Sequence, residues 1–124
     1  MFFRHRIVTS VLAVVQAALF LSSLHAEALP VAEKTKIEAL IRSVASANDV
    51  QFVRNGRAYD SATAATFLRR KWQANASDVS SARDFVEKIA SASGTSGKPY
   101  LIRRKDGSEI SSKDFLLAEL RKLE

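Results

Sequence analysis

Two Asx-Gly pairs, Asn55-Gly56 and Asp106-Gly107, constrain the fold of this chain most, because each separates two short apolar runs. Asparagine, aspartate and glycine tolerate positive φ, which a tight hairpin turn requires. Val50–Arg54 precedes the first pair, with Val50, Phe52 and Arg54 on one side of the expected strand, and Arg57–Tyr59 follows it. The sequence therefore predicts a β-hairpin here.

The second Asx-Gly pair predicts a second hairpin of the same kind. Residues 99–103 would form its first strand, 105–108 its turn and Glu109-Ile110 its short return. A hairpin alone is marginally stable in water. We therefore expect the two hairpins to pair into one small antiparallel sheet, with helices packed on one side.

A polar pair follows each hairpin and predicts the start of a helix. Superposing the two Asx-Gly pairs places Asp60-Ser61 opposite Ser111-Ser112. We interpret the recurring order as a degenerate ββα repeat, although similar local physics without duplication would produce it too. The sequence predicts helices at 31–47, from a cap at Asp60 or Ser61 to Ala74, after a Ser81-x-x-Asp84 capping box, and after a Ser111-x-x-Asp114 box. The predicted fold class is α+β, in the order α-ββ-α-α-ββ-α.

The N-terminus has the three-part layout of a secretory signal peptide. Arg4 and Arg6 precede an uncharged run, 7–24, and an A-x-A site follows. We expect cleavage after Ala28 or, alternatively, Ala26. A retained membrane anchor is the rival interpretation, because the run is about long enough to cross a bilayer. The expected organisation is a signal peptide at 1–28, a single small domain at 29–124 and a periplasmic location.

Residues 29–124 contain neither cysteine nor histidine, since His5 and His25 both lie in the predicted leader. Disulfides, thiolate metal sites and histidine-based acid–base catalysis therefore need residues that this segment lacks. Asp60, Asp84 and Asp114 are each explained as helix caps or first-turn acids. We expect no cofactor, no metal and no enzymatic activity. A carboxylate-dependent hydrolase acting on an envelope polymer is an alternative.

Basic residues gather at 69–71, at 103–105 and beside the first turn. In the plain interpretation, the helix dipole favours the cations at 69–71 near a helix C-terminus, and those at 103–105 form a solvated strand edge that discourages aggregation. The functional interpretation is a face that binds anions. Trp72 suits either the core or such a face. The candidate residues are Arg54, Asn55, Arg69, Arg70, Lys71, Trp72, Arg103 and Arg104.

Because of this basic face, the function that we favour is that of a non-enzymatic binding or accessory protein of the cell envelope. Expected partners are an anionic envelope polymer, a lipid headgroup or an acidic protein. Nucleic acid is disfavoured for an exported protein, and a membrane would be engaged only through an uncleaved leader. A structural protein–protein interaction module is a further alternative.

Four motifs together resemble an uncharacterised family of short exported proteobacterial proteins, a domain of unknown function. They are FVRNG at 52–56, LRRKW at 68–72, FVEKIA at 85–90 and SGKPY at 96–100. The resemblance covers about 37–120 and implies location and architecture, without an activity. It also implies that relatives carry two cysteines where Val50 and Arg104 stand here, so this chain departs from that pattern and a redox role is in doubt.

Overall fold

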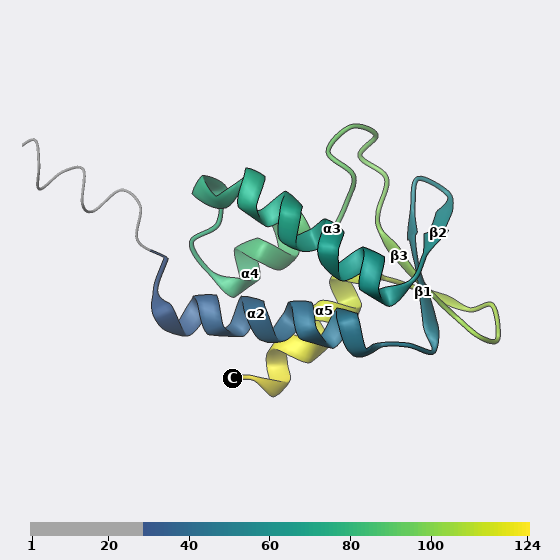
Figure 1. Ribbon diagram of the computed structural model, residues 1–124, viewed down its shortest axis with the longest axis horizontal. Helices are drawn as coiled ribbons and strands as arrows, with labels where there is room; N and C mark the ends of the chain where they lie inside the picture. The colour runs from purple at the N-terminus through teal and green to yellow at the C-terminus, as the bar shows by residue number, and fades with distance from the viewer. Residues whose placement is uncertain (1–28) are drawn as a thin grey trace, which may run out of the picture.

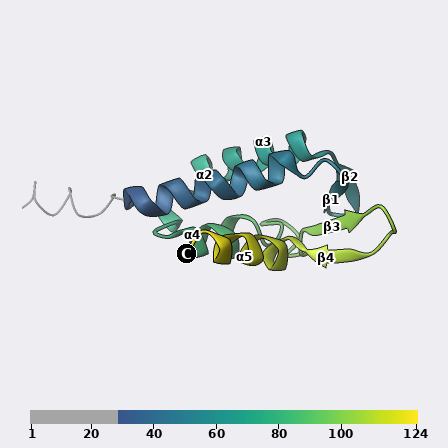
Figure 2. The ribbon, with the colours of Figure 1, turned by 90° about the horizontal axis from the view of Figure 1, so that it is seen from below.

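The computed structural model describes residues 29–124, and the predicted leader lies outside these residues. Four helices gather on one side of a four-stranded sheet (Figure 1). In the view of Figure 2, α2 and α3 form one layer and α4 and α5 a second, with the sheet at one end. The elements are α2 Val31–Ser46, β1 Val50–Arg54, β2 Arg57–Tyr59, α3 Ser61–Ala74, the 3₁₀ turn η1 Ala76–Asp78, α4 Ala82–Asp84, the π-helix η2 Phe85–Ile89, β3 Leu101–Arg104, β4 Glu109–Ser111 and α5 Ser112–Lys122.

The sheet confirms the prediction that two hairpins pair. Its strand order is β2-β1-β3-β4, all antiparallel, so the first strands of the two hairpins lie side by side at the centre. The β1–β3 register sets Val50 opposite Arg104 and Phe52 opposite Ile102. Each hairpin leads into a capped helix, so the ββα order recurs.

Both turns adopt the backbone conformation that the Asx-Gly pairs predict. Asn55 and Gly56 have φ of 50° and 78°, and Gly107 has φ of 86°. In the second hairpin the carboxylate of Asp106 also accepts the amide of Ser108 at 2.9 Å, which closes the turn locally.

The helix starts also follow the sequence. Asp60, rather than Ser61, caps α3 by accepting the Thr63 amide at 2.8 Å. Ser81 and Ser111 each accept the amide three residues ahead at 3.0 Å. These bonds satisfy amides that have no partner within the first helical turn.

Several boundaries differ from the predictions, most of them by one or two residues. The short η1 lies between the second and third predicted helices, and β3 begins at Leu101 instead of Pro99. The third helix is α-helical for three residues only and continues as the π-helix η2, where the Ala90 amide bonds to the Phe85 carbonyl at 3.1 Å. The wider turn accompanies complete burial of Phe85 and Val86, which lie side by side in the sequence.

One apolar core joins all the helices to the sheet. Ile37, Leu40 and Val44 of α2 are fully buried, and Leu116 of α5 meets them from the other layer. No helix among residues 29–124 has the length and apolar character needed to cross a membrane.

Candidate functional site

A recess lined by three cations lies between α3, the end of β1 and the 93–95 loop. Arg54, Arg70 and Lys71 contribute its charge, and Phe67 and Tyr100 its aromatic walls. No aspartate or glutamate lines this recess, and within residues 29–124 none of the three cations forms an ion pair. We call these five side chains the cationic recess.

Arg54 extends from the end of β1 over an aromatic ring of α3. Its Cζ lies 4.5 Å from the centre of the Phe67 ring, a cation–π distance. Its Nε is enclosed and has no hydrogen-bond partner among the described residues. A buried, unpartnered N–H costs about 1–3 kcal/mol. The position of Arg54 therefore carries a cost within the folded protein.

Lys71 organises the opposite wall of the cationic recess. Its Nζ donates to the Tyr100 hydroxyl at 2.9 Å and to the Ala92 carbonyl at 2.8 Å. The same ammonium lies 4.8 Å from the centre of the Tyr100 ring. Tyr100 in turn meets Phe67 edge-on, with ring centres 5.9 Å apart. Two aromatic rings in contact therefore lie between two cations, and the four side chains form a continuous row of contacts from Arg54 to Lys71.

Asn55 ties the first hairpin turn to the loop that closes the recess. Its Oδ1 accepts from the Ser96 hydroxyl at 2.6 Å, and its Nδ2 donates to Ser93 Oγ at 3.4 Å. Ser93 is buried and also contacts Thr95. Asn55 thus has two roles: it supplies the positive φ of the turn, and it holds the loop beside Arg54.

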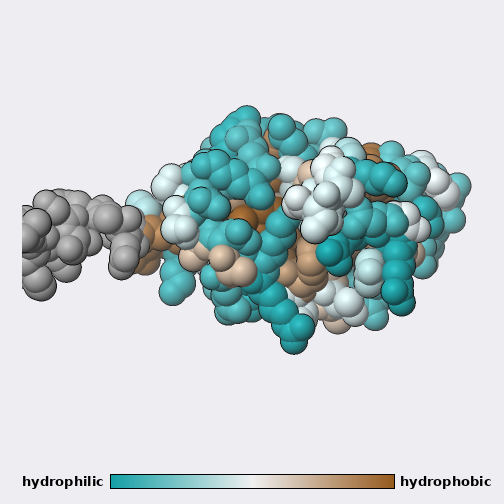
Figure 3. Space-filling model, turned by 90° about the horizontal axis from the view of Figure 1, so that it is seen from above, coloured by the Kyte–Doolittle hydropathy of each residue, from teal (hydrophilic) through white to brown (hydrophobic). Residues whose placement is uncertain are grey.

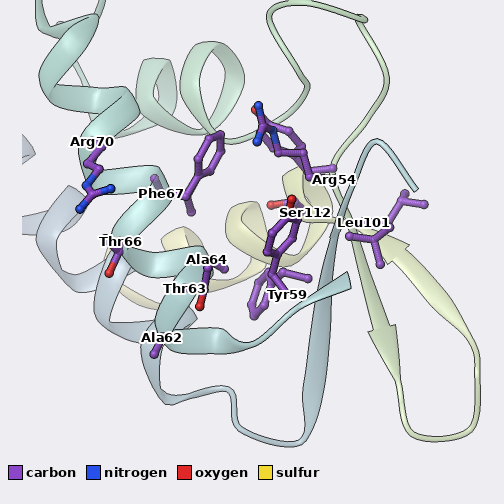
Figure 4. A pocket seen from close by; sticks show the side chains of 14 residues that line it. Arg54, Tyr59, Ala62, Thr63, Ala64, Thr66, Phe67, Arg70, Leu101 and Ser112 are labelled. Atoms are coloured by element: carbon purple, nitrogen blue, oxygen red, sulfur yellow. The ribbon is translucent and has the colours of Figure 1, made fainter. Parts of the chain in front are cut away.

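An apolar cavity of about 450 Å³ adjoins the cationic recess. It lies between the first half of α3 and the first hairpin, and it shares Arg54, Phe67, Arg70 and Tyr100 with the recess. Figure 4 shows Arg54 and Phe67 at one end of the cavity, while the guanidinium of Arg70 extends along the outside of α3. In Figure 3, apolar surface is visible in hollows between hydrophilic side chains on the side where α3 lies.

The remaining sequence-predicted residues lie elsewhere. Arg69 faces α2, where it contacts Glu38 at 2.8 Å, and Arg103 pairs across its hairpin with Glu109 at 3.3 Å. Trp72 is buried against Phe85, so it occupies the core. Arg104 is exposed at the end of β3, away from the cationic recess. The structure therefore brings together Arg54, Asn55, Arg70 and Lys71 only.

Three of the four acidic groups with lowered pKa values in residues 29–124 serve turns and helix starts, and the fourth, Glu33, pairs with Lys36. Hydrogen bonds from the Ser80 hydroxyl and amide lower the pKa of Asp84, and bonds from Ser108 do the same for Asp106. Hydrogen bonds from the Thr63 side chain and amide lower the pKa of Asp60. None of these carboxylates lines the recess or the cavity. Among residues 29–124, no cluster of three acidic, histidine or cysteine side chains could hold a metal ion.

Sequence reasoning missed Phe67 and Ser93 as parts of the site, and it considered Tyr100 only as an aromatic residue interleaved with the cations. Their partners are far along the chain: Lys71 and Tyr100 are 29 residues apart, and Asn55 and Ser93 are 38 apart. The available signal was the interleaving of cations with aromatic residues, which sequence analysis applied to Trp72, Tyr59 and Tyr100 alike.

The fold and the site together define a small α+β domain with a cationic recess beside an apolar cavity. The chain belongs to a family of unknown function, DUF5329, whose model matches residues 31–124. This assignment confirms the resemblance as far as an uncharacterised bacterial family is concerned.

One curated relative is the uncharacterized protein YfeK of Salmonella typhimurium strain LT2. It is 37% identical over 68 residues, which cover 55% of this chain and 57% of the relative. The chain thus matches little more than half of that protein's length. No solved structure matches this chain.

Proposed function

We propose that this protein is a non-enzymatic, anion-binding protein of the bacterial periplasm, and that the cationic recess is its binding site. The observation that carries the proposal is the contrast between its cations. Arg54, Arg70 and Lys71 share a recess without a carboxylate, whereas Arg69 and Arg103 are paired with glutamates.

The chemistry of the lining supports binding over catalysis. Carboxylate-based hydrolysis needs two acidic groups that converge on a substrate, and neither the recess nor the cavity has one. Arginine guanidinium groups are suited to carboxylate and phosphate oxygens because they donate two parallel hydrogen bonds. The bound group would therefore be a carboxylate or a phosphate.

The periplasmic location rests on the sequence of residues 1–28. Cleavage after Ala28 or Ala26 would release the described domain. Fractionation of the producing cell, followed by mass spectrometry of the protein's N-terminus, tests this part. An intact Met1 on cytosolic material would exclude it.

A retention experiment tests the anion site. The purified protein is applied to anionic and neutral matrices over a salt series, since screening weakens exposed ionic contacts as salt rises. We expect salt-dependent retention on the anionic matrix only, and a clear loss of it in Arg54→Gln/Arg70→Gln.

The matched control removes the same amount of charge outside the recess. Arg104→Gln/Lys105→Gln changes two exposed cations at the second hairpin tip, and its retention should stay close to that of the unmodified protein. Equal losses in both double variants would indicate net charge alone, and a loss confined to the control would place the site on the second hairpin. Either outcome would overturn the proposal.

A further inference from the structure

The apolar cavity gives the proposed anion site a second half. It adjoins the cationic recess, since four side chains line both. At about 450 Å³ it lies within the range of roughly 300–1,000 Å³ that is common for small-molecule sites. A ligand whose charged end contacts Arg54 therefore has space beside it for an apolar body.

The lining of the cavity favours a hydrocarbon body over a polar one. Its walls come from α3, strand β1, the end of β2 at Tyr59 and the segment around Leu101. The apolar and aromatic members are Phe52, Val53, Tyr59, Ala62, Ala64, Phe67, Leu68, Tyr100 and Leu101. Polar groups are few, namely the hydroxyls of Thr63, Thr66 and Ser112 and the two arginines it shares with the recess. Transfer of apolar surface from water into such a site is favourable.

We propose that the ligand is a single-chain anionic amphiphile, of the class of a free medium- or long-chain carboxylate. Its chain would occupy the cavity, and its acidic head would meet Arg54, with Lys71 on the recess side of the same ring pair and Arg70 adding positive charge from the outside of α3. Charge complementarity identifies this occupant, because the cavity's rim carries only cations. The inference rests on the proposed function and deepens it, since it names the ligand of the same site.

The shape of the site also excludes simpler ligands as its best occupants. A small inorganic anion would use the cationic recess and leave the cavity unfilled. A neutral lipid would fill the cavity and leave the guanidinium of Arg54 without an acceptor. Only a molecule with both parts satisfies the two halves together.

Titration calorimetry with a homologous series of ligands tests the inference on the unmodified protein. The series runs from acetate through hexanoate and octanoate to decanoate, with octanol as the neutral member of matched length. Each added methylene should tighten binding about fourfold, so decanoate should bind about two-hundredfold more tightly than hexanoate. Octanol should bind at least about tenfold more weakly than octanoate, since it lacks the charged hydrogen bonds.

A cavity-filling variant separates the two halves of the site. Thr63 lines the cavity (Figure 4), and its amide donates to Asp60 in the helix cap, a bond that a backbone amide keeps in any side-chain variant. Thr63→Trp should therefore abolish the gain with chain length while salt-dependent retention on the anionic matrix persists. Ala32→Trp, at an exposed position of α2, is the control and should retain both properties.

The outcomes distinguish the inference from the proposed function. Equal affinity for acetate and decanoate, with retention intact, would overturn the amphiphile and leave the anion site. Octanol binding as tightly as octanoate, with Arg54→Gln/Arg70→Gln unchanged, would overturn both. Binding to anionic lipid vesicles that is insensitive to Thr63→Trp, without binding of free decanoate, would assign the recess to a membrane surface and overturn the free ligand.

Discussion

A disulfide between positions 50 and 104 should form and stabilise the protein, because Val50 and Arg104 are cross-strand partners at the centre of the sheet. Arg54 and Arg57 flank the two-residue turn and form a backbone hydrogen-bonded pair between β1 and β2. Along β1, successive residues then direct their backbone hydrogen bonds alternately to β2 and to β3. Val50 therefore faces Arg104 as a non-hydrogen-bonded pair, whose Cα atoms lie about 4.5 Å apart, within the range for a disulfide.

The size of the effect follows from the loop that the bond would close. For about 55 residues, the chain-entropy estimate gives roughly 4 kcal/mol of stabilisation. Loss of the part-buried Val50 side chain offsets about 1 kcal/mol of this. The net gain of about 3 kcal/mol should raise Tm by roughly 12–24 °C for a domain of this size.

Thermal unfolding of Val50→Cys/Arg104→Cys, oxidised and reduced, measures this gain. Val50→Cys/Arg103→Cys is the matched control, because adjacent residues of a strand point to opposite faces. It should form no intramolecular bond, which a mass difference after thiol alkylation reports. Efficient bonding in the control, or none in the 50–104 pair, would refute the assigned β1–β3 register.

Four further perturbations test the core, the turns, the caps and the site. Leu116→Ala should lower the free energy of unfolding by about 2–5 kcal/mol in urea titrations, because the side chain is fully buried. Gly107→Ala should cost about 1–2 kcal/mol at φ of 86°, whereas Gly94→Ala, with no contact within 4 Å of its added carbon, should be nearly neutral. Hydrogen bonds lower the pKa of Asp84, so its contribution to the free energy of unfolding should be present above the ordinary pKa of 3.8 and be lost as pH falls through the folded-state pKa. Urea titrations at a series of acidic pH values should show a smaller loss of stability for Asp84→Asn than for the unmodified protein. Arg54→Met should bind anions less well in the retention assay and unfold at an equal or higher urea concentration, since it removes an enclosed, unpartnered N–H.

Local features of the sequence predicted most of the fold. The turn at Asn55-Gly56 and the caps at Asp60 and Ser111 each depend on residues within a few positions of one another. For such contacts, residue type and spacing carry nearly all the information. The bounds of β1 and β2 were accordingly predicted to the residue.

The third helix shows where this information ends. Phe85, Val86 and Ile89 have a spacing that fits an amphipathic α-helix, yet the structure has a π-helical turn there. Packing from both helix layers buries all three side chains, and tertiary contacts of this kind override a local preference. The spacing of apolar residues in the sequence therefore does not distinguish an α-helical from a π-helical turn at 85–89.

The candidate site was predictable in its residue types and unpredictable in its membership. A run such as Arg69-Arg70-Lys71 distributes its side chains around a helix, because successive residues are about 100° apart. Arg69 consequently meets Glu38 on α2, while Lys71 meets Tyr100 on the opposite side. Sequence analysis treats such a run as one patch, whereas the folded helix divides it among different neighbours.

Arg54 differs from Arg69 in what it gains from its neighbours in the folded protein. The half-exposed pair between Arg69 and Glu38 contributes at most about 1 kcal/mol, so its arginine is explained by modest local gain. Arg54 gains a cation–π contact of similar size but leaves an enclosed N–H unpartnered, which costs as much or more. A methionine would pack against Phe67 without that cost. Stability alone therefore does not account for an arginine at position 54, and a residue that breaks a local rule without structural gain is expected at a functional site. Arg54 lines both the cationic recess and the apolar cavity, so its guanidinium lies where an anionic ligand would contact it.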